Sequence, residues 1–218
     1  MPISERQITN AIHSGICAAN EKYEKWSKGC WVTDSGVEGL MTAEIAEAIN
    51  KKQSKDESLE LEVAFKHIRT CSTANIARGR RPTALNENNR ADIVLFNCDY
   101  QPTCVIEVKR SWDYNNCWLD LQRICALVDR YSSNKQGYLD NGFLAMLIAK
   151  REGRINSPEG IFENYLKKVK EYVEYEFNNA SRKISIHHKL ARTLPNYYQK
   201  EYGNWQAWSL IIQISRAE

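Results

Sequence analysis

The chain has 218 residues, of which 43% are hydrophobic and 26% charged, so it carries enough apolar side chains for one full core. It contains no apolar run of about 18 residues and no signal-peptide pattern, which excludes a membrane partner on sequence grounds. The net charge of +3 is too small to indicate nucleic-acid binding by itself. Seven cysteines form no C-x-x-C pair and no zinc-ligand spacing. We therefore expect a single soluble domain, residues 1–218, in a reducing cytoplasmic setting.

Two amphipathic helices are predicted near the N-terminus, because residues 4–26 and 34–52 each place apolar side chains at helical spacing. In the second segment, Glu38 falls at the edge of the apolar stripe, on the side of Ile45, instead of on the polar face. Its position makes Glu38 a candidate for a buried polar site. Ser35 and Glu38 also fit a capping box, which would give the same acid a purely structural use.

The next two segments are less regular. Residues 54–71 fit a helix and a strand equally well, and Glu60 or Glu62 there is either a further metal ligand or simply solvated. Residues 69–90 have the composition of a loop. Four guanidinium groups lie in that loop, at Arg78, Arg80, Arg81 and Arg90. A basic loop suits contact with the phosphates of a polyanion, whereas the alternative is pairing with local acids.

A hairpin of two apolar strands is predicted over Ala91–Phe96 and Cys104–Lys109, joined by a polar turn rich in Asn, Asp and Pro. Strands that are apolar on both faces belong in the middle of a sheet. If the hairpin turns symmetrically, Asp92 lies opposite Glu107, and Glu107 shares a face with Lys109.

Two facing carboxylates on a half-buried sheet repel each other and destabilise it. A divalent cation held by oxygens relieves this repulsion, and Mg²⁺ uses one or two carboxylates together with water and substrate phosphate. Beside such a cation, Lys109 would orient or deprotonate a water, or steady charge at phosphorus. The alternative is that Lys109 is a plain salt-bridge partner of Asp92 and Glu107.

The remaining segments predict an α/β arrangement. A helix over residues 117–131 followed by an apolar strand over 142–150 makes a right-handed crossover, which places that strand parallel to the hairpin's second strand. A long helix begins near residue 157. Residues 183–190 and 205–215 are strand-like and either extend the sheet or form a terminal hairpin.

Asp92 in "ADIVLF", followed by "VIEVK", resembles the PD-(D/E)XK nuclease superfamily, which has the restriction-endonuclease-like fold. Ala91 stands where the family name has Pro. The resemblance covers about residues 31–150. It implies an α/β (α+β) fold with a central mixed β-sheet flanked by helices. The helix at 4–26 and an extra C-terminal helix and strands over 155–218 lie outside that core.

The same resemblance implies a metal-dependent nuclease that hydrolyses phosphodiester bonds, with DNA as the expected substrate. Asp92 and Glu107 would bind Mg²⁺, with Mn²⁺ as a substitute, and Lys109 would assist the attacking water. Glu38 would supply the acid that the first core helix often contributes to the metal site. A homodimer is a further option, because a chain of this size often pairs when it must cut both strands.

Nucleic-acid contacts are expected from Arg80, Arg81 and Arg90, and from Gln122, because some family members carry a glutamine on the corresponding helix. The fuller Gln-x-x-x-Tyr form is absent, since Ala126 occupies its last position. Two other interpretations stay open. One is a nuclease-like module that binds nucleic acid or protein without cutting, and the other is an unrelated α/β domain with a structural ion-pair network.

Overall fold

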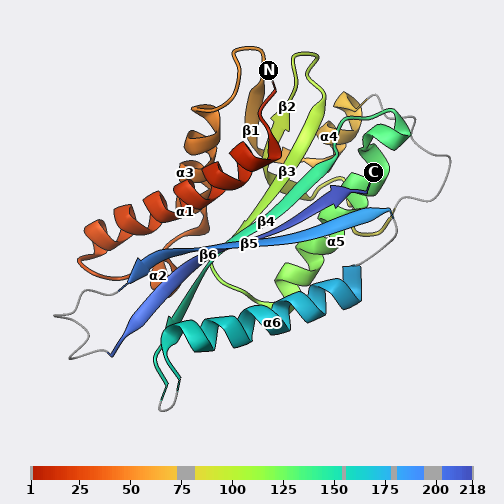
Figure 1. Ribbon diagram of the computed structural model, residues 1–218. Coiled ribbons are helices and arrows are strands. Elements are labelled where there is room, and N and C mark those ends of the chain that lie inside the picture. The colour runs from red at the N-terminus through yellow and green to blue at the C-terminus, as the bar shows by residue number, and fades with distance from the viewer. Residues whose placement is uncertain (1, 73–81, 154–155, 178–180, 194–202, 218) are drawn as a thin grey trace.

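The computed structural model describes residues 2–72, 82–153, 156–177, 181–193 and 203–217. Six strands form one mixed sheet in the order β1-β2-β3-β4-β6-β5 (Figure 1). The strands are β1 (Ser58–Ala64), β2 (Arg90–Phe96), β3 (Pro102–Lys109), β4 (Asn141–Arg151), β5 (Arg182–Thr193) and β6 (Trp205–Arg216). Strands β3 and β4 run parallel, and the other neighbouring pairs are antiparallel. The described part of the chain is therefore a mixed α/β fold, as expected.

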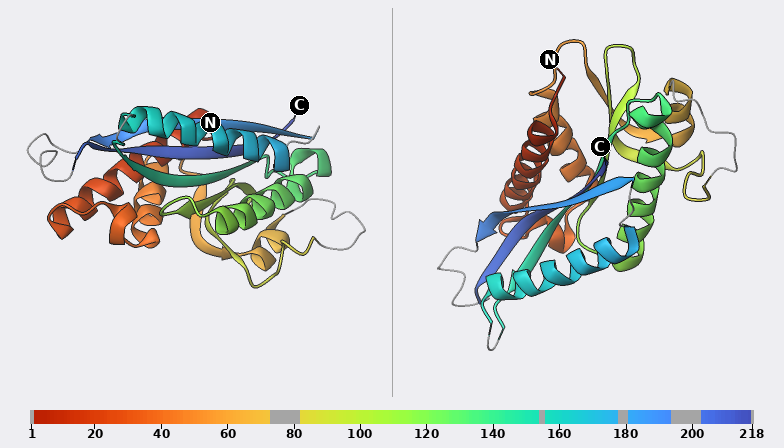
Figure 2. Two further views of the ribbon diagram at one scale, coloured as in Figure 1. Left: turned by 90° about the horizontal axis from the view of Figure 1, so that it is seen from below. Right: turned by 45° about the vertical axis from the view of Figure 1, so that its right-hand side comes forward.

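Helices cover both faces of the sheet. They are α1 (Glu5–Ser27), α2 (Val32–Ser35), α3 (Glu38–Asn50), α4 (Phe65–Cys71), α5 (Tyr114–Tyr131) and α6 (Pro158–Phe177), with a short 3₁₀ turn at Ser133–Lys135. One core cluster joins α1 and α3 to the sheet, and the other joins α5 and α6 to its opposite face. Figure 1 shows these two helical layers on either side of the strands, and Figure 2 shows the strong twist of the sheet between them.

The predicted hairpin is confirmed, together with its register. Ile93 pairs with Ile106 and Val94 with Val105, and an irregularity in the pairing follows Leu95 at the turn end. Continuing this register by one residue brings Asp92 opposite Glu107. Both strands lie inside the sheet, β2 between β1 and β3 and β3 between β2 and β4, which explains why both of their faces are apolar.

The ambiguous segment 54–71 contains both elements, the strand β1 and then the helix α4. The two meet at Ala64, whose backbone is still extended before the first helical residue. Strand β4 runs parallel to β3, as the crossover argument predicts. The two C-terminal strands extend the sheet, because β6 pairs with β4 and β5 pairs with β6.

The alternative use of Glu38, in a capping box with Ser35, does not occur. Ser35 is the last residue of α2, and its hydroxyl lies 3.0 Å from the Tyr23 hydroxyl. Helix α3 begins at Glu38 with Val37 as its N-cap, and no side chain caps it. The Glu38 carboxylate is therefore free to serve another purpose.

Helices α1 and α3 cross closely at Gly15, and this contact makes a stability prediction. A Cβ atom at Gly15 would overlap the backbone of Ile45, which cannot move without shifting α3. We expect Gly15→Ala to lower the free energy of unfolding by about 1–3 kcal/mol, the usual cost of overpacking. Gly39→Ala is the matched control, because a Cβ at Gly39 meets nothing within 4 Å and alanine favours the helix. Urea unfolding of the two variants checks this, and equal stabilities would contradict the packing argument.

None of the helices within the described ranges is long and apolar enough to cross a membrane. All seven cysteines are free thiols. Cys104, Cys117 and Cys125 are buried, and burial raises the pKa of each thiol. These three side chains therefore behave as small hydrophobes in the core.

Candidate active site

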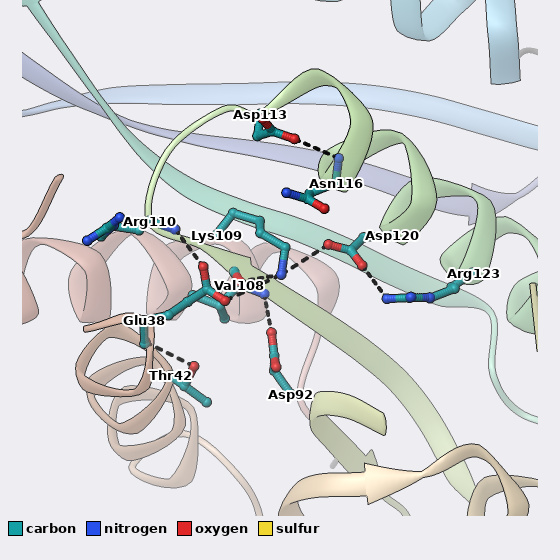
Figure 3. A network of polar contacts seen from close by, with 10 residues as sticks. All are labelled: Glu38, Thr42, Asp92, Val108, Lys109, Arg110, Asp113, Asn116, Asp120 and Arg123. Carbon is teal, nitrogen blue, oxygen red and sulfur yellow. Dashed lines mark hydrogen bonds and ion pairs between the residues drawn. The ribbon is translucent and has the colours of Figure 1, made fainter. Parts of the chain in front are cut away.

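Four elements meet where strand β3 ends. Strand β3 supplies Glu107 and Lys109, and β2 supplies Asp92 near its beginning. Helix α3 directs its first residue, Glu38, at this point from one side, and α5 approaches from the other (Figure 3). Because β3 is central in the sheet, these polar groups lie at the edge of the core instead of on a loop.

The Glu107 carboxyl group is buried. The residue is 3% exposed, and its Oε1 atom has no hydrogen-bond partner among the described residues. Burial raises the pKa of Glu107 well above its ordinary value, and the nearby carboxylates of Asp92 and Asp120 raise it further. A buried polar atom without a hydrogen-bond partner destabilises the fold. A bound ligand or a proton on the carboxyl group would remove this cost.

Asp92 is partly buried beside Glu107. Its Oδ2 atom accepts a hydrogen bond of 2.6 Å from the backbone N–H of Val108, which fixes the carboxylate against β3. Burial raises the pKa of Asp92, and this effect exceeds the opposing effects of the Val108 N–H and of Lys109. Asp92 and Glu107 thus form a pair of acids that both resist ionisation without a compensating cation.

The Lys109 ammonium lies between two acids from opposite helical layers. Its Nζ atom is 3.1 Å from Asp120 Oδ2 on α5 and 3.4 Å from Glu38 Oε1 on α3. Burial alone would lower the pKa of Lys109, but Asp120, Glu38 and Asp92 together raise it above its ordinary value. Lys109 is therefore a fixed positive charge. Such a group is better suited to orienting a water molecule or stabilising negative charge than to removing a proton.

Glu38 joins the site through a second contact. Its Oε2 atom accepts a hydrogen bond of 3.1 Å from the Arg110 backbone N–H, and the Arg110 guanidinium donates to the Gly36 carbonyl at 3.0 Å. These bonds tie the start of α3 to the segment that follows β3. The structure therefore brings Glu38 into the site as a partner of Lys109.

Asp120 and Arg123 on α5 are functional candidates that the sequence pattern did not single out. Asp120 is 2% exposed, and its Oδ1 atom accepts a hydrogen bond of 2.6 Å from Arg123 Nη1. A sequence signal for Asp120 exists, because this acid falls within the apolar stripe of α5, between Cys117 and Ile124.

The donor set fits a hard divalent cation with two protein carboxylates. Among the described residues, no group of three or more His, Cys, Asp and Glu side chains is arranged to hold a metal ion. Mg²⁺ is bound through one or two carboxylates, with water and phosphate completing its shell. Asp92 and Glu107 meet this requirement, and the unpartnered Oε1 of Glu107 is the atom that such a cation would satisfy.

Of the other predicted site residues, Arg90 and Gln122 fall within the described part of the chain. Arg80 and Arg81 are outside the described residues, and so is Arg78. Arg90 is exposed at the first position of β2. Gln122 lines a different pocket, which it shares with Arg130 and Arg182. Their proposed contacts with nucleic acid stay predictions.

The two acids of β1 also have defined places. Glu60 contacts the Tyr100 hydroxyl and lies 3.9 Å from the His67 ring nitrogen, so it belongs to a separate cluster. Glu62 has a left-handed backbone with φ of 54°, and its charge contributes to the raised pKa of Asp92. The structure therefore places the charge of Glu62 within electrostatic reach of Asp92.

Comparisons of the chain with protein-family models, with curated proteins and with solved structures found no match.

Proposed function

We propose that the chain is a Mg²⁺-dependent nuclease that hydrolyses phosphodiester bonds, with DNA as its substrate and a restriction-endonuclease-like core. The observation that carries the proposal is the acid pair of partly buried Asp92 and buried Glu107, with the Lys109 ammonium held beside it. A cluster with two repelling carboxylates is costly as a purely structural device, and a cation is the simplest partner for it.

Each residue has a role in this proposal. Asp92 and Glu107 would hold the cation, which when bound lowers the pKa of water and polarises the phosphate. Lys109 would donate hydrogen bonds from Nζ to the attacking water or to a phosphate oxygen, where negative charge develops. Glu38 and Asp120 would keep that ammonium in place. Arg80, Arg81 and Arg90 would contact the sugar-phosphate backbone.

A cleavage assay tests the proposal. Purified protein is incubated with supercoiled plasmid, single-stranded DNA and RNA in Mg²⁺ or Mn²⁺, with EDTA as the control. We expect DNA cleavage that EDTA abolishes and added Mg²⁺ restores. Cleavage of RNA alone would mean that the substrate is RNA instead of DNA, while the proposed phosphodiester hydrolysis would still hold. Intact polymers under all of these conditions would overturn the nuclease and favour a nuclease-like domain that binds without cutting.

A further inference from the structure

A small pocket on the flank of α5 adjoins the acid pair. It has a volume of ≈ 230 Å³, and its lining residues are Glu38, Lys109, Asn116, Leu119, Asp120 and Arg123. Pockets for whole ligands occupy roughly 300–1,000 Å³, so this one suits a single small group instead of a nucleotide base. Lys109 belongs both to the pocket and to the cluster with Asp92, which places the pocket directly beside the proposed chemistry (Figure 3).

Asp120 is the buried residue of this pocket, and it holds the two cationic side chains in place. Its side chain is 3% exposed, whereas those of Lys109 and Arg123 are 19% and 27% exposed. The buried carboxylate pairs with both cations at once, through separate oxygens. It therefore holds two donors side by side while its own charge is withdrawn from solvent.

Most N–H donors of Arg123 have no hydrogen-bond partner among the described residues. The guanidinium carries five N–H donors, and in the described part of the chain only Nη1 has a bond, to Asp120. The planar fork of arginine matches the oxygens of a phosphate, and one anchored edge leaves the other available. The Asn116 side chain lines the same pocket and adds an amide.

The acids of the lining do not oppose an anion here. Asp120 is neutralised by two cations, and both oxygens of Glu38 are engaged, by Lys109 and by the Arg110 N–H. The N–H groups of Arg123 and Asn116 that have no partner among the described residues are therefore the donors that the pocket offers to an anion.

We propose that Arg123 and Asn116 bind a phosphate of the nucleic-acid backbone in this pocket, and that Asp120 is the residue that positions Arg123 and Lys109. This inference rests on the proposed nuclease function and extends its substrate contacts to α5. It assigns Arg123 as a binding residue and Asp120 as a positioning residue that acts through its two partners.

The test measures DNA affinity and cleavage separately. Fluorescein-labelled single-stranded and duplex oligonucleotides are titrated at several salt concentrations, in EDTA and in Ca²⁺. We expect Arg123→Ala to weaken binding about tenfold, as the loss of one charged hydrogen bond would, and to reduce the slope of log K against log salt concentration by about one. Arg123→Lys should keep the slope but bind more weakly than wild type, because it retains the charge without the fork. Arg6→Ala, which removes an exposed charge from α1, is the matched control and should behave as wild type.

Asp120→Asn separates positioning from binding and from folding. We expect kcat to fall more than tenfold, with a smaller change in KM and with the fold retained by circular dichroism. Wild-type affinity and salt slope in Arg123→Ala, with DNA bound and cut by the wild type, would overturn this inference and leave the nuclease standing. Failure of the wild type to bind or cut DNA would instead overturn the proposed function, and this inference with it.

Discussion

Glu107→Gln should abolish cleavage and also make the cation-free protein more stable at alkaline pH. Loss of cleavage follows because one of only two carboxylates for the cation is removed. Changing groups that merely support metal ligands costs 10- to 100-fold, so the loss of a ligand should exceed about 100-fold. The gain in stability follows because the buried carboxylate lacks a partner.

The pH dependence of this effect has a defined sign. The pKa of Glu107 is raised in the folded protein, so the folded state keeps this proton to a higher pH than the unfolded state does. Wild type should therefore lose stability as the pH rises from the ordinary value of 4.5 through the raised pKa. Each pH unit by which the pKa is raised contributes about 1.4 kcal/mol to that loss.

Urea unfolding in EDTA at pH 5 and pH 8 measures the difference. We expect Glu107→Gln to lose less stability than wild type between the two pH values. Glu171→Gln on the exposed face of α6 serves as the control and should follow wild type. An equal loss in Glu107→Gln and wild type would show that Glu107 is not the strained group.

Lys109→Ala should remove cleavage as well, but it should destabilise the fold. A positioned group that stabilises developing charge is worth about 10²–10³ in rate, so we expect a loss of that order in kcat. The fold suffers because Asp120 is buried and would keep only Arg123 as a partner. Leaving a buried hydrogen-bonding group less satisfied costs about 1–3 kcal/mol.

The opposite signs of the two stability effects distinguish a functional site from a structural ion-pair network. In a purely structural network, every acid helps to hold the Lys109 ammonium. Both Glu107→Gln and Lys109→Ala would then lower the free energy of unfolding. The double variant Lys109→Ala/Asp120→Asn adds a check, because it removes both charges of one pair and should recover part of the stability that Lys109→Ala loses. No recovery would mean that the Lys109–Asp120 contact does not couple the two residues.

The acid pair was predictable because its geometry depends on a hairpin. Strand alternation, together with the assumption of a symmetric turn, matched Asp92 with Glu107 from the sequence, although a turn of this length allows other registers. The register between Ile93 and Ile106 agrees with that argument. Glu38 was also named, but its partners were not, since they depend on how α3 docks against the end of β3.

Asp120 and Gln122 show where sequence reasoning stops. They are two positions apart on α5, so their side chains point about 200° apart around the helix. Asp120 faces Lys109, and Gln122 faces a different pocket. The apolar stripe predicts the helix but not which flank of it meets the site, because that depends on the contacts of α5 with the sheet and with α6. The resemblance favoured Gln122, and the contacts favour Asp120.

The proposed nuclease depends on Asp92 and Glu107 holding a divalent cation together. Calorimetric titration of the metal-free protein with Mn²⁺ tests it most directly, comparing wild type with the variant Asp92→Asn/Glu107→Gln. We predict that wild type binds Mn²⁺ through this site and gains stability on binding, and that the double variant folds but loses both effects. Unchanged Mn²⁺ binding in the folded double variant would contradict the claim, and so would cleavage of nucleic acid by that variant.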